Sequence, residues 1–369
     1  MPETIWIDRG AELEALAHQL SPEPSIGLDT EFLRERTFFP KLCLLQLAAG
    51  GRVWCVDTLH CGSLEPLAAV LTGPGARKVI HSARQDLEAF YLAMSRSRAR
   101  VISPVFDTQV AAACIGFKPQ IGYAELVKSL LGVTLVKGQT RTDWSRRPLT
   151  QAQLEYAADD VAYLNEAAAL LTERLRELGR ENWALEDCRA LENERLYDPD
   201  PADAWKRLRS VRQLPQPIRA RAQALAIWRE RTARERDLPR GWILSDEALF
   251  STAEAGPTTP AALAAAVAPQ KALNDSLTRG VLEALAGAAA SPSADGEPAR
   301  DLRPTPEQRA KIERLAGVVD ARAAALGVSA EVLAPRGELK ALAMGNLGIQ
   351  ALEGWRQAEI GNALLEALG

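Results

Sequence analysis

Two carboxylates stand close together in the run Ile-Gly-Leu-Asp-Thr-Glu-Phe, at Asp29 and Glu31. The segment Ile26 to Phe32 is mostly apolar and predicts a β-strand. Because side chains alternate across a strand, both carboxylates leave the same face. Carboxylate oxygens are the ligands that Mg²⁺ and Mn²⁺ favour. On its own, the pair indicates with equal weight a divalent metal site or a solvated strand face.

Three further residues are candidates for the same chemistry. Asp86 follows a predicted strand and stands near the start of a helix, where alone it favours a partner for the helix dipole. Tyr156 and Asp160 are four residues apart in a predicted helix, so they share one face about one turn apart. Neither pattern alone distinguishes a catalytic site from an ordinary helix face.

The order of these residues resembles the DEDD exonuclease superfamily in its tyrosine branch: Asp-x-Glu on an early strand, Asp at a helix start, then Tyr-x-x-x-Asp on a later helix. Its histidine branch carries a His five residues before the last Asp, where this chain has Glu155. The neighbouring segments resemble the ribonuclease D family more narrowly, namely Gly27 to Phe32, Val105 to Gln109, Thr142 to Leu149 and Tyr156 to Val161.

This resemblance implies a nuclease with two divalent metal ions, Mg²⁺ or Mn²⁺. Such a pair, about 4 Å apart, activates a water on one side of a phosphodiester and stabilises the departing oxygen on the other. By resemblance, Asp29 bridges both metals, Glu31 and Asp160 hold the metal that activates water, and Asp86 supports the other metal, partly through water. Tyr156 orients the attacking water. Because a free tyrosine has a pKa of about 10, a role as general base requires a strongly shifted pKa.

The elements that position these residues alternate between strands and helices, which predicts an α/β domain. The first three strands are joined by short connections and predict an antiparallel meander. The resemblance implies a ribonuclease H-like mixed sheet flanked by helices. Strands are predicted over Ile26–Phe32, Leu42–Ala48, Arg52–Asp57, Lys78–His81 and Val101–Phe106, and helices over Ala11–Leu20, Leu64–Leu71, Arg84–Ala93, Thr108–Ile115, Tyr123–Leu131 and Gln151–Leu178.

Two breaks in composition divide the chain. Tyr197 to Ala202 is an acidic stretch interrupted by prolines, which neither a helix nor a strand easily crosses. Ala288 to Pro306 is rich in Ser, Pro, Gly and Ala, which is typical of a linker. The predicted domains are therefore residues 1–197, 203–287 and 303–369.

The two later domains carry helical patterns and no clear period-2 strand, so both are predicted to be small and all-α. By resemblance they are helicase-and-RNase-D C-terminal (HRDC) domains. The first matches through Ala204 to Leu208 and Leu238 to Leu244, and the second more loosely through Leu326 to Ser329 and Leu333 to Leu339.

Composition excludes several classes of protein. The chain has 369 residues, of which 47% are hydrophobic and 25% charged, as in ordinary globular proteins. Its longest apolar runs are about half the length that a membrane span needs. No secretory signal is visible, so we expect a cytoplasmic protein without a membrane partner. The five cysteines form no Cys-x-x-Cys pair and are expected to be buried thiols.

Charge is unevenly distributed, although the net formal charge is only −4. Residues 203–240 hold 11 basic and 4 acidic side chains, which predicts a surface for RNA phosphates, with a merely solvated helix face as the alternative. Aromatic residues after the Asp-x-Glu strand could stack terminal bases or belong to the core. The candidate RNA-contacting residues are Lys137, Arg141, Arg146, Arg147, Phe38, Phe39, Lys206 and Arg207.

The resulting prediction is a metal-dependent 3′-to-5′ exoribonuclease that releases 5′-nucleoside monophosphates. The expected substrates are tRNA precursors and other small structured RNAs, and the protein is expected to be a monomer with no obligate protein partner. Two alternatives stay open: a DNA 3′-to-5′ exonuclease with the same site, and a catalytically silent RNA-binding protein.

Overall fold

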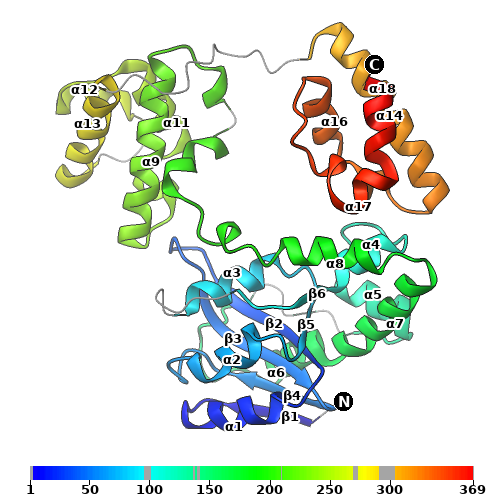
Figure 1. The fold of residues 1–369 in the computed structure, drawn as a ribbon. Helices are drawn as coiled ribbons and strands as arrows, with labels where there is room; N and C mark the ends of the chain where they lie inside the picture. The colour runs from blue at the N-terminus through cyan, green and yellow to red at the C-terminus, as the bar shows by residue number, and fades with distance from the viewer. Residues whose placement is uncertain are drawn as a thin grey trace. The chain divides into compact units, whose positions relative to one another are not determined.

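The N-terminal part of the chain forms one six-stranded mixed sheet (Figure 1). The computed structural model describes residues 3–94, 101–135, 138, 142–208, 210–268, 273–290 and 304–368. The strands are β1 (Glu3–Ile7), β2 (Ser25–Leu33), β3 (Lys41–Ala49), β4 (Arg52–Val56), β5 (Arg77–Ile80) and β6 (Val105–Asp107), in the order β1-β4-β3-β2-β5-β6.

Strands β2, β3 and β4 pair antiparallel, which confirms the predicted meander. Strand β1 was not predicted. It pairs parallel to β4 at the edge of the sheet, and such a pairing between distant segments leaves no local signal. The last strand is also shorter than predicted, because regular pairing begins only at Val105.

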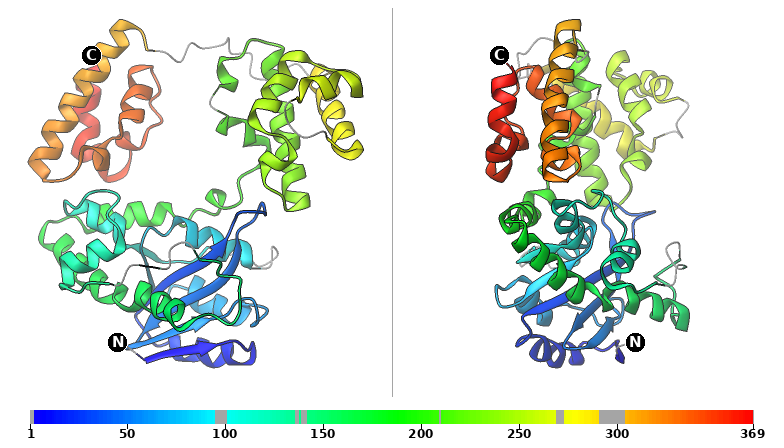
Figure 2. Two further views of the ribbon diagram at one scale, coloured as in Figure 1. Left: turned by 180° about the vertical axis from the view of Figure 1, so that it is seen from behind. Right: turned by 90° about the vertical axis from the view of Figure 1, so that its right-hand side faces the viewer.

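Helices cover both faces of this sheet (Figure 2). One face carries α1 (Ala11–Leu20), α2 (Glu65–Thr72) and α3 (Arg84–Ala93), whose buried leucines share a core with the sheet. The other face carries α6 (Gln151–Ala162) and α7 (Leu164–Glu177). The remaining helices of this part are α4 (Thr108–Cys114), α5 (Tyr123–Leu131), α8 (Glu181–Ala190) and the short η1 (Glu194–Leu196).

The single helix predicted from Gln151 to Leu178 is two helices. It breaks at Tyr163, whose backbone N–H donates to the Tyr123 hydroxyl at 3.2 Å. The break lies beside Gly27 of β2, where an added Cβ would meet Leu164 Cβ and the Val161 carbonyl oxygen at 3.2 Å each. A glycine at that position allows α6 and α7 to pack closely on the strand that carries the predicted catalytic pair.

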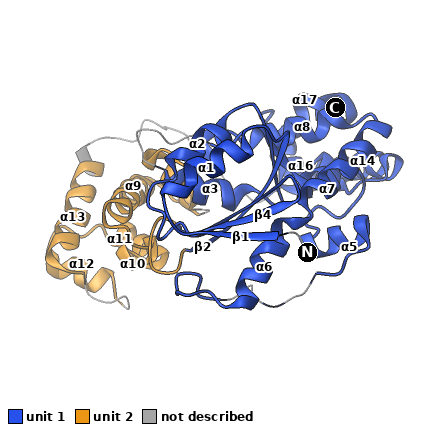
Figure 3. Cartoon of the chain, turned by 90° about the horizontal axis from the view of Figure 1, so that it is seen from below, with its two compact units in different colours: residues 1–33, 41–197, 304–369 blue, residues 34–40, 198–303 orange. Residues whose placement is uncertain are grey.

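The chain separates into two compact units (Figure 3). One unit comprises Met1–Leu33, Lys41–Tyr197 and Pro304–Gly369, and the other comprises Arg34–Pro40 and Asp198–Arg303. In the described residues of the second unit, the regular elements are all helices. Its central helix α9 (Ile218–Arg236) packs against η2 (Pro201–Arg207), η3 (Val211–Gln213), α10 (Arg240–Ile243), α11 (Asp246–Ala255) and α13 (Asp275–Ala290), and α12 (Pro260–Ala266) packs against α11 and α13.

The C-terminal segment is also all-helical, and its core is continuous with the core on the α6 face of the sheet. The Trp183 ring of α8 stacks on the Trp355 ring at 4.1 Å, and Arg356 makes two hydrogen bonds to the Asp187 carboxylate at 2.6 and 2.8 Å. The segment contains α14 (Pro306–Leu326), α15 (Ala330–Leu333), α16 (Arg336–Ala343), η4 (Gln350–Leu352), α17 (Gly354–Arg356), the π-helix η5 (Gln357–Gly361) and α18 (Asn362–Leu368). The assignment of residues 303–369 as a second HRDC domain, and the three-domain division, stay predictions.

All five cysteines are buried free thiols, as predicted. Across the described ranges, no helix combines the length and the apolar character required to cross a bilayer.

Candidate active site

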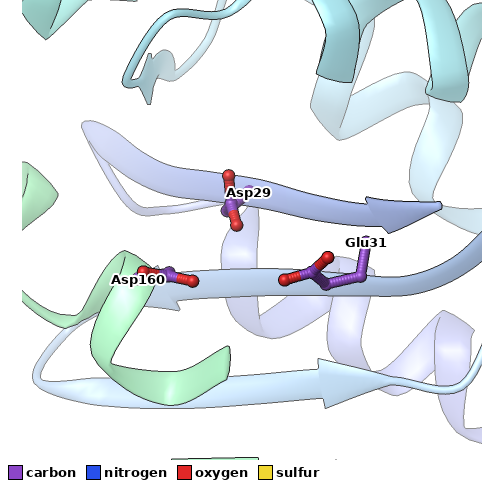
Figure 4. A group of neighbouring side chains, drawn as sticks. All are labelled: Asp29, Glu31 and Asp160. Atoms are coloured by element: carbon purple, nitrogen blue, oxygen red, sulfur yellow. The ribbon is translucent and has the colours of Figure 1, made fainter. Parts of the chain in front are cut away.

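Three of the predicted carboxylates converge. Asp29 and Glu31 come from the middle of β2, and Asp160 comes from the end of α6 (Figure 4). One carboxylate oxygen from each lies within 4.8 Å of the others, and all three side chains are partly exposed. We call these three residues the acidic cluster.

Local sequence explains why these elements meet. Helix α6 begins at a capping box, in which Thr150 and Gln153 satisfy each other's backbone N–H groups. From that start, helical spacing brings Tyr156 and Asp160 to one face, and α6 packs across β2, β3 and β4. The sheet face of Asp29 and Glu31 is the face that α6 covers.

Asp86 stands beside the acidic cluster rather than in it. Strand β5 pairs with β2 only over Ser25–Gly27, so the edge of β2 beyond Gly27 is free of β5. The Asp86 carboxylate, from the first turn of α3, accepts hydrogen bonds there from the Thr30 N–H at 3.2 Å and the Thr30 hydroxyl at 2.6 Å. Asp86 is thus held at the strand that carries the cluster, and its negative charge acts on Asp29.

Burial and mutual repulsion raise the pKa of each of these carboxyl groups. Loss of water around Asp29, followed by the charges of Asp86 and Asp160, holds its pKa well above the ordinary value. Burial, then Asp160 and Asp86, raises the pKa of Glu31 to about 8. Burial also raises the pKa of Asp86 and of Asp160 to about 7, although a hydrogen-bonded neighbour partly offsets it in each case.

The donor set of the acidic cluster fits a divalent cation. Carboxylate oxygens are hard ligands, and Mg²⁺ typically uses one or two of them while it keeps water and substrate phosphate. Crowded carboxylates with raised pKa values are also the arrangement that a cation relieves, because an opposite charge favours their ionised forms. The residues that would hold metal are therefore Asp29, Glu31 and Asp160, with Asp86 at their side.

Tyr156 is half-buried next to the acidic cluster. Its ring lies 6.1 Å from the ring of Trp144, which is buried. Burial, followed by the charges of Asp160 and Glu31, raises the pKa of Tyr156 above its ordinary value. With a pKa above that of a free tyrosine, the hydroxyl keeps its proton near neutral pH and is available as a hydrogen-bond donor.

Arg147 is not available to RNA, so its prediction as a phosphate contact is wrong. Its Nε and Nη2 donate to the buried Asp57 carboxylate at 2.6 and 2.8 Å. The remaining N–H groups donate to the carbonyl oxygens of Trp144, Arg146 and Cys43 at 2.7, 2.8 and 2.9 Å. A guanidinium has five N–H donors, and all of them are used inside the protein.

The other predicted contacts of this segment differ from Arg147. The Arg146 side chain is 85% exposed and forms one ion pair with Asp143 at 3.4 Å, so it can still reach a phosphate. Lys137 and Arg141 lie outside the described residues.

Phe38 belongs to the core of the second unit, which decides between the two alternatives for this residue. It is buried, with the Arg240 guanidinium 4.3 Å from its ring centre and its N–H donated to the Asp237 carboxylate at 3.0 Å. Phe39 donates its N–H to the same carboxylate oxygen and packs against the same small core. A base-stacking role for Phe38 is therefore wrong, because its ring is already covered.

Lys206 and Arg207 are about half exposed, and each has an acidic partner. Lys206 pairs with Asp203 and Arg207 pairs with the buried Glu230, both at 2.7 Å. Pairing does not bar a phosphate contact, but it reduces the charge that either residue offers.

Sequence reasoning missed three residues that lie beside the acidic cluster. Thr30 holds Asp86, and Gln46 of β3 lies directly opposite Asp29 in the pairing of the two strands. Burial, followed by the charges of Asp160 and Asp29, raises the pKa of Tyr123 above its ordinary value. Of these, only Thr30 carried a local signal, because it lies between Asp29 and Glu31.

Comparison with known proteins agrees with this geometry. A family model for 3′-5′ exonucleases matches residues 4–176, and an HRDC domain model matches residues 219–285. The first match places the sheet and the acidic cluster in the class of 3′-5′ exonucleases.

Full-length relatives define the family within that class. The chain is 37% identical to ribonuclease D of Gluconacetobacter diazotrophicus, over 99% of this chain and 92% of the relative, and 34% identical to ribonuclease D of Pseudomonas paraeruginosa, over 100% and 98%. The crystal structure of Escherichia coli RNase D, an exoribonuclease involved in structured RNA processing, superposes with a TM-score of 0.88 at 32% identity, over 99% of this chain and 98% of that chain. The chain therefore belongs to the ribonuclease D family of 3′-to-5′ exoribonucleases.

Proposed function

We propose that the acidic cluster is the catalytic site of this exoribonuclease and that it releases 5′-nucleoside monophosphates one at a time. The observation that carries this proposal is the convergence of Asp29, Glu31 and Asp160 within 4.8 Å, with Asp86 and Tyr156 beside them. Two divalent ions, Mg²⁺ or Mn²⁺, would supply the activation of water and the stabilisation of the departing oxygen.

The chain's own residues orient the reacting groups. Asp29 would be a ligand of both metal ions, and Glu31 and Asp160 would hold the ion that activates water. Asp86 is kept in place by its hydrogen bonds from Thr30. The protonated Tyr156 hydroxyl orients the attacking water, since its raised pKa argues against proton removal by this residue.

The proposed substrates are tRNA precursors and other small structured RNAs in the cytoplasm. The E. coli relative acts in structured RNA processing, and this chain matches it over almost its full length. The segment 203–240, which overlaps the HRDC match at residues 219–285, has a surplus of basic residues and would contribute affinity that does not depend on sequence. Of the predicted RNA-contacting residues that the structure describes, the exposed Arg146 and the half-exposed Lys206 and Arg207 are the proposed phosphate contacts.

A direct test uses matched RNA and DNA strands labelled at the 5′ end. With Mg²⁺ or Mn²⁺ the full-length protein should shorten RNA from its 3′ end and release nucleoside 5′-monophosphates, and a chelator should stop the reaction. Preferred cleavage of DNA would instead identify a DNA exonuclease.

The variant Asp29→Asn keeps the size of the side chain and removes one negative charge. We expect turnover to fall at least about a thousandfold, with fold and RNA affinity retained, because the change removes a metal ligand and not a packing contact. The matched control is Asp8→Asn, an exposed aspartate outside the acidic cluster. Near-normal turnover of Asp29→Asn would refute the assignment.

A further inference from the structure

Gln46 lies next to the acidic cluster, on the neighbouring strand. In the pairing of β2 with β3, Asp29 stands opposite Gln46, and in the pairing of β3 with β4, Gln46 stands opposite Cys55. Directly opposed residues in an antiparallel pair point to the same face, with Cβ atoms about 5 Å apart. The Gln46 side chain therefore shares the sheet face of Asp29, under α6.

The Gln46 amide is buried without a hydrogen bond. Its exposed fraction is 0%, and within the described part of the chain neither Oε1 nor Nε2 has a partner. Buried side-chain amides in native proteins nearly always have a partner, because an unmade hydrogen bond in the interior is costly. Such an orphaned amide indicates a contact made with something other than protein.

Asp29 is the polar residue that the pairing of β2 with β3 places directly beside the Gln46 amide. The positions beside it on the same face of β3 are Leu44 and Ala48, and the next residue across the sheet is the thiol of Cys55. The α6 residues over this face include Ala157 and Ala158, which are apolar and buried.

We propose that Gln46 is a positioning residue of the active site. Its side-chain amide donates an N–H to one buried water, and that water donates to the Asp29 carboxylate. This bridge holds Asp29 in the orientation in which it binds a divalent metal ion. A water is required because no direct hydrogen bond joins the two side chains, and a buried water is stable where it finds two or more polar partners.

The inference rests on the proposed function, because it needs a metal at Asp29. Removal of a group that hydrogen-bonds to a metal ligand, without touching the metal itself, typically weakens metal affinity by about 10- to 100-fold. A buried glutamine with no role at the metal site predicts a different result. Its replacement by an apolar residue of similar size should raise the melting temperature and leave metal affinity unchanged.

The experiment compares Gln46→Met with Leu47→Met in the full-length protein. Both changes lie on β3 and have similar size, but Leu47 belongs to the core on the opposite face of the sheet. Mn²⁺ binding is measured by titration calorimetry, the melting temperature without metal by scanning calorimetry, and turnover over a range of Mn²⁺ concentrations.

For Gln46→Met we expect the dissociation constant for Mn²⁺ to rise at least about tenfold, with an unchanged or higher melting temperature and with turnover restored by excess Mn²⁺. Leu47→Met should leave Mn²⁺ binding unchanged. Equal Mn²⁺ affinity for Gln46→Met and wild type would overturn the inference. If Gln46→Met does not fold, Gln46→Leu carries the same test.

Asp29→Asn, measured in the same way, separates this inference from the proposed function. If Asp29→Asn also leaves Mn²⁺ binding unchanged, the metal site itself is wrong. If Asp29→Asn weakens binding and the Gln46 variants do not, only the role of Gln46 is wrong.

Discussion

Glu230 allows a sharp test of how the helical unit is stabilised. Its side chain is 2% exposed, and it accepts hydrogen bonds from Arg240 Nε at 2.5 Å and Arg240 Nη2 at 2.8 Å. Arg207 lies 2.7 Å from the same carboxylate, and Arg234 lies 3.6 Å from it. Burial alone would raise the pKa of Glu230, but the guanidinium groups of Arg240 and Arg207 outweigh it and lower the pKa to about 2.

The magnitude follows from this lowered pKa. Relative to an ordinary glutamate, a pKa of about 2 corresponds to about 3 kcal/mol of stabilisation at neutral pH. Because Arg207 and Arg240 are 46% and 35% exposed, water screens part of the interaction, and we expect about 2 kcal/mol. Since the pKa is lowered in the folded state, this contribution is complete above the unfolded pKa near 4.5 and is lost as pH falls towards 2.

The test compares wild type, Glu230→Gln and Glu235→Gln by urea unfolding at several pH values. Glu235 is exposed on the same helix and serves as the matched control. A brief hydrogen-exchange pulse at a common pH, read by mass spectrometry in peptides of α9, reports unfolding of this unit within the full-length protein.

Glu230→Gln should cost about 2 kcal/mol at pH 7, and its difference from wild type should shrink steadily between about pH 5 and pH 2. Glu235→Gln should stay within about 0.5 kcal/mol of wild type throughout. A difference for Glu230→Gln that does not depend on pH would refute the electrostatic account.

Three further predictions concern the site and its supports. Tyr156→Phe should lower kcat at least about a hundredfold with KM changed less than about threefold, because only the orienting hydroxyl is lost; single-turnover kinetics measure this, and an unchanged rate would make Tyr156 a packing residue. Arg147→Ala should lower the melting temperature with a cost of about 3 kcal/mol, because buried Asp57 loses its guanidinium partner and keeps His60 and the Leu59 N–H. Arg146→Ala should instead keep stability and flatten the slope of log affinity for RNA against log salt by about 0.7 to 0.9; the opposite pattern would contradict the hydrogen bonds of Arg147. Trp355→Ala should cost about 3 to 5 kcal/mol in urea unfolding, since it removes the ring stacked on α8, and a change below about 1 kcal/mol would show that the C-terminal segment is only loosely attached.

The members of the acidic cluster could be predicted because their positions depend on local spacing. Asp29 and Glu31 share a face through the alternation of one strand, and Tyr156 and Asp160 share a face through one helical turn. The resemblance supplied what spacing alone lacks, the expectation that these two elements meet. The antiparallel meander was equally accessible, since its connections are short.

Residues whose surroundings depend on pairing between distant segments could not be predicted from local spacing. Gln46 comes to lie beside Asp29 only through the register of β2 and β3. Arg147 appears free in a basic loop sequence, yet its donors are taken by Asp57, which is 90 residues away in the chain. In both cases the decisive contact joins elements whose register or proximity leaves no trace in the local pattern.

The charge surplus of residues 203–240 also shows that local sequence does not reveal which charges are paired in the folded unit. By composition this segment offers 11 basic side chains against 4 acidic ones. In the folded unit, however, Arg207, Arg234 and Arg240 surround Glu230, while Arg229 is buried and pairs with Asp246 at 2.7 Å. These arginines stabilise the unit, so the charge left for phosphates is smaller than the surplus suggests. The salt dependence of RNA binding should therefore report fewer contacts than the count of basic residues, since each phosphate contact adds only about 0.7 to 0.9 to the slope.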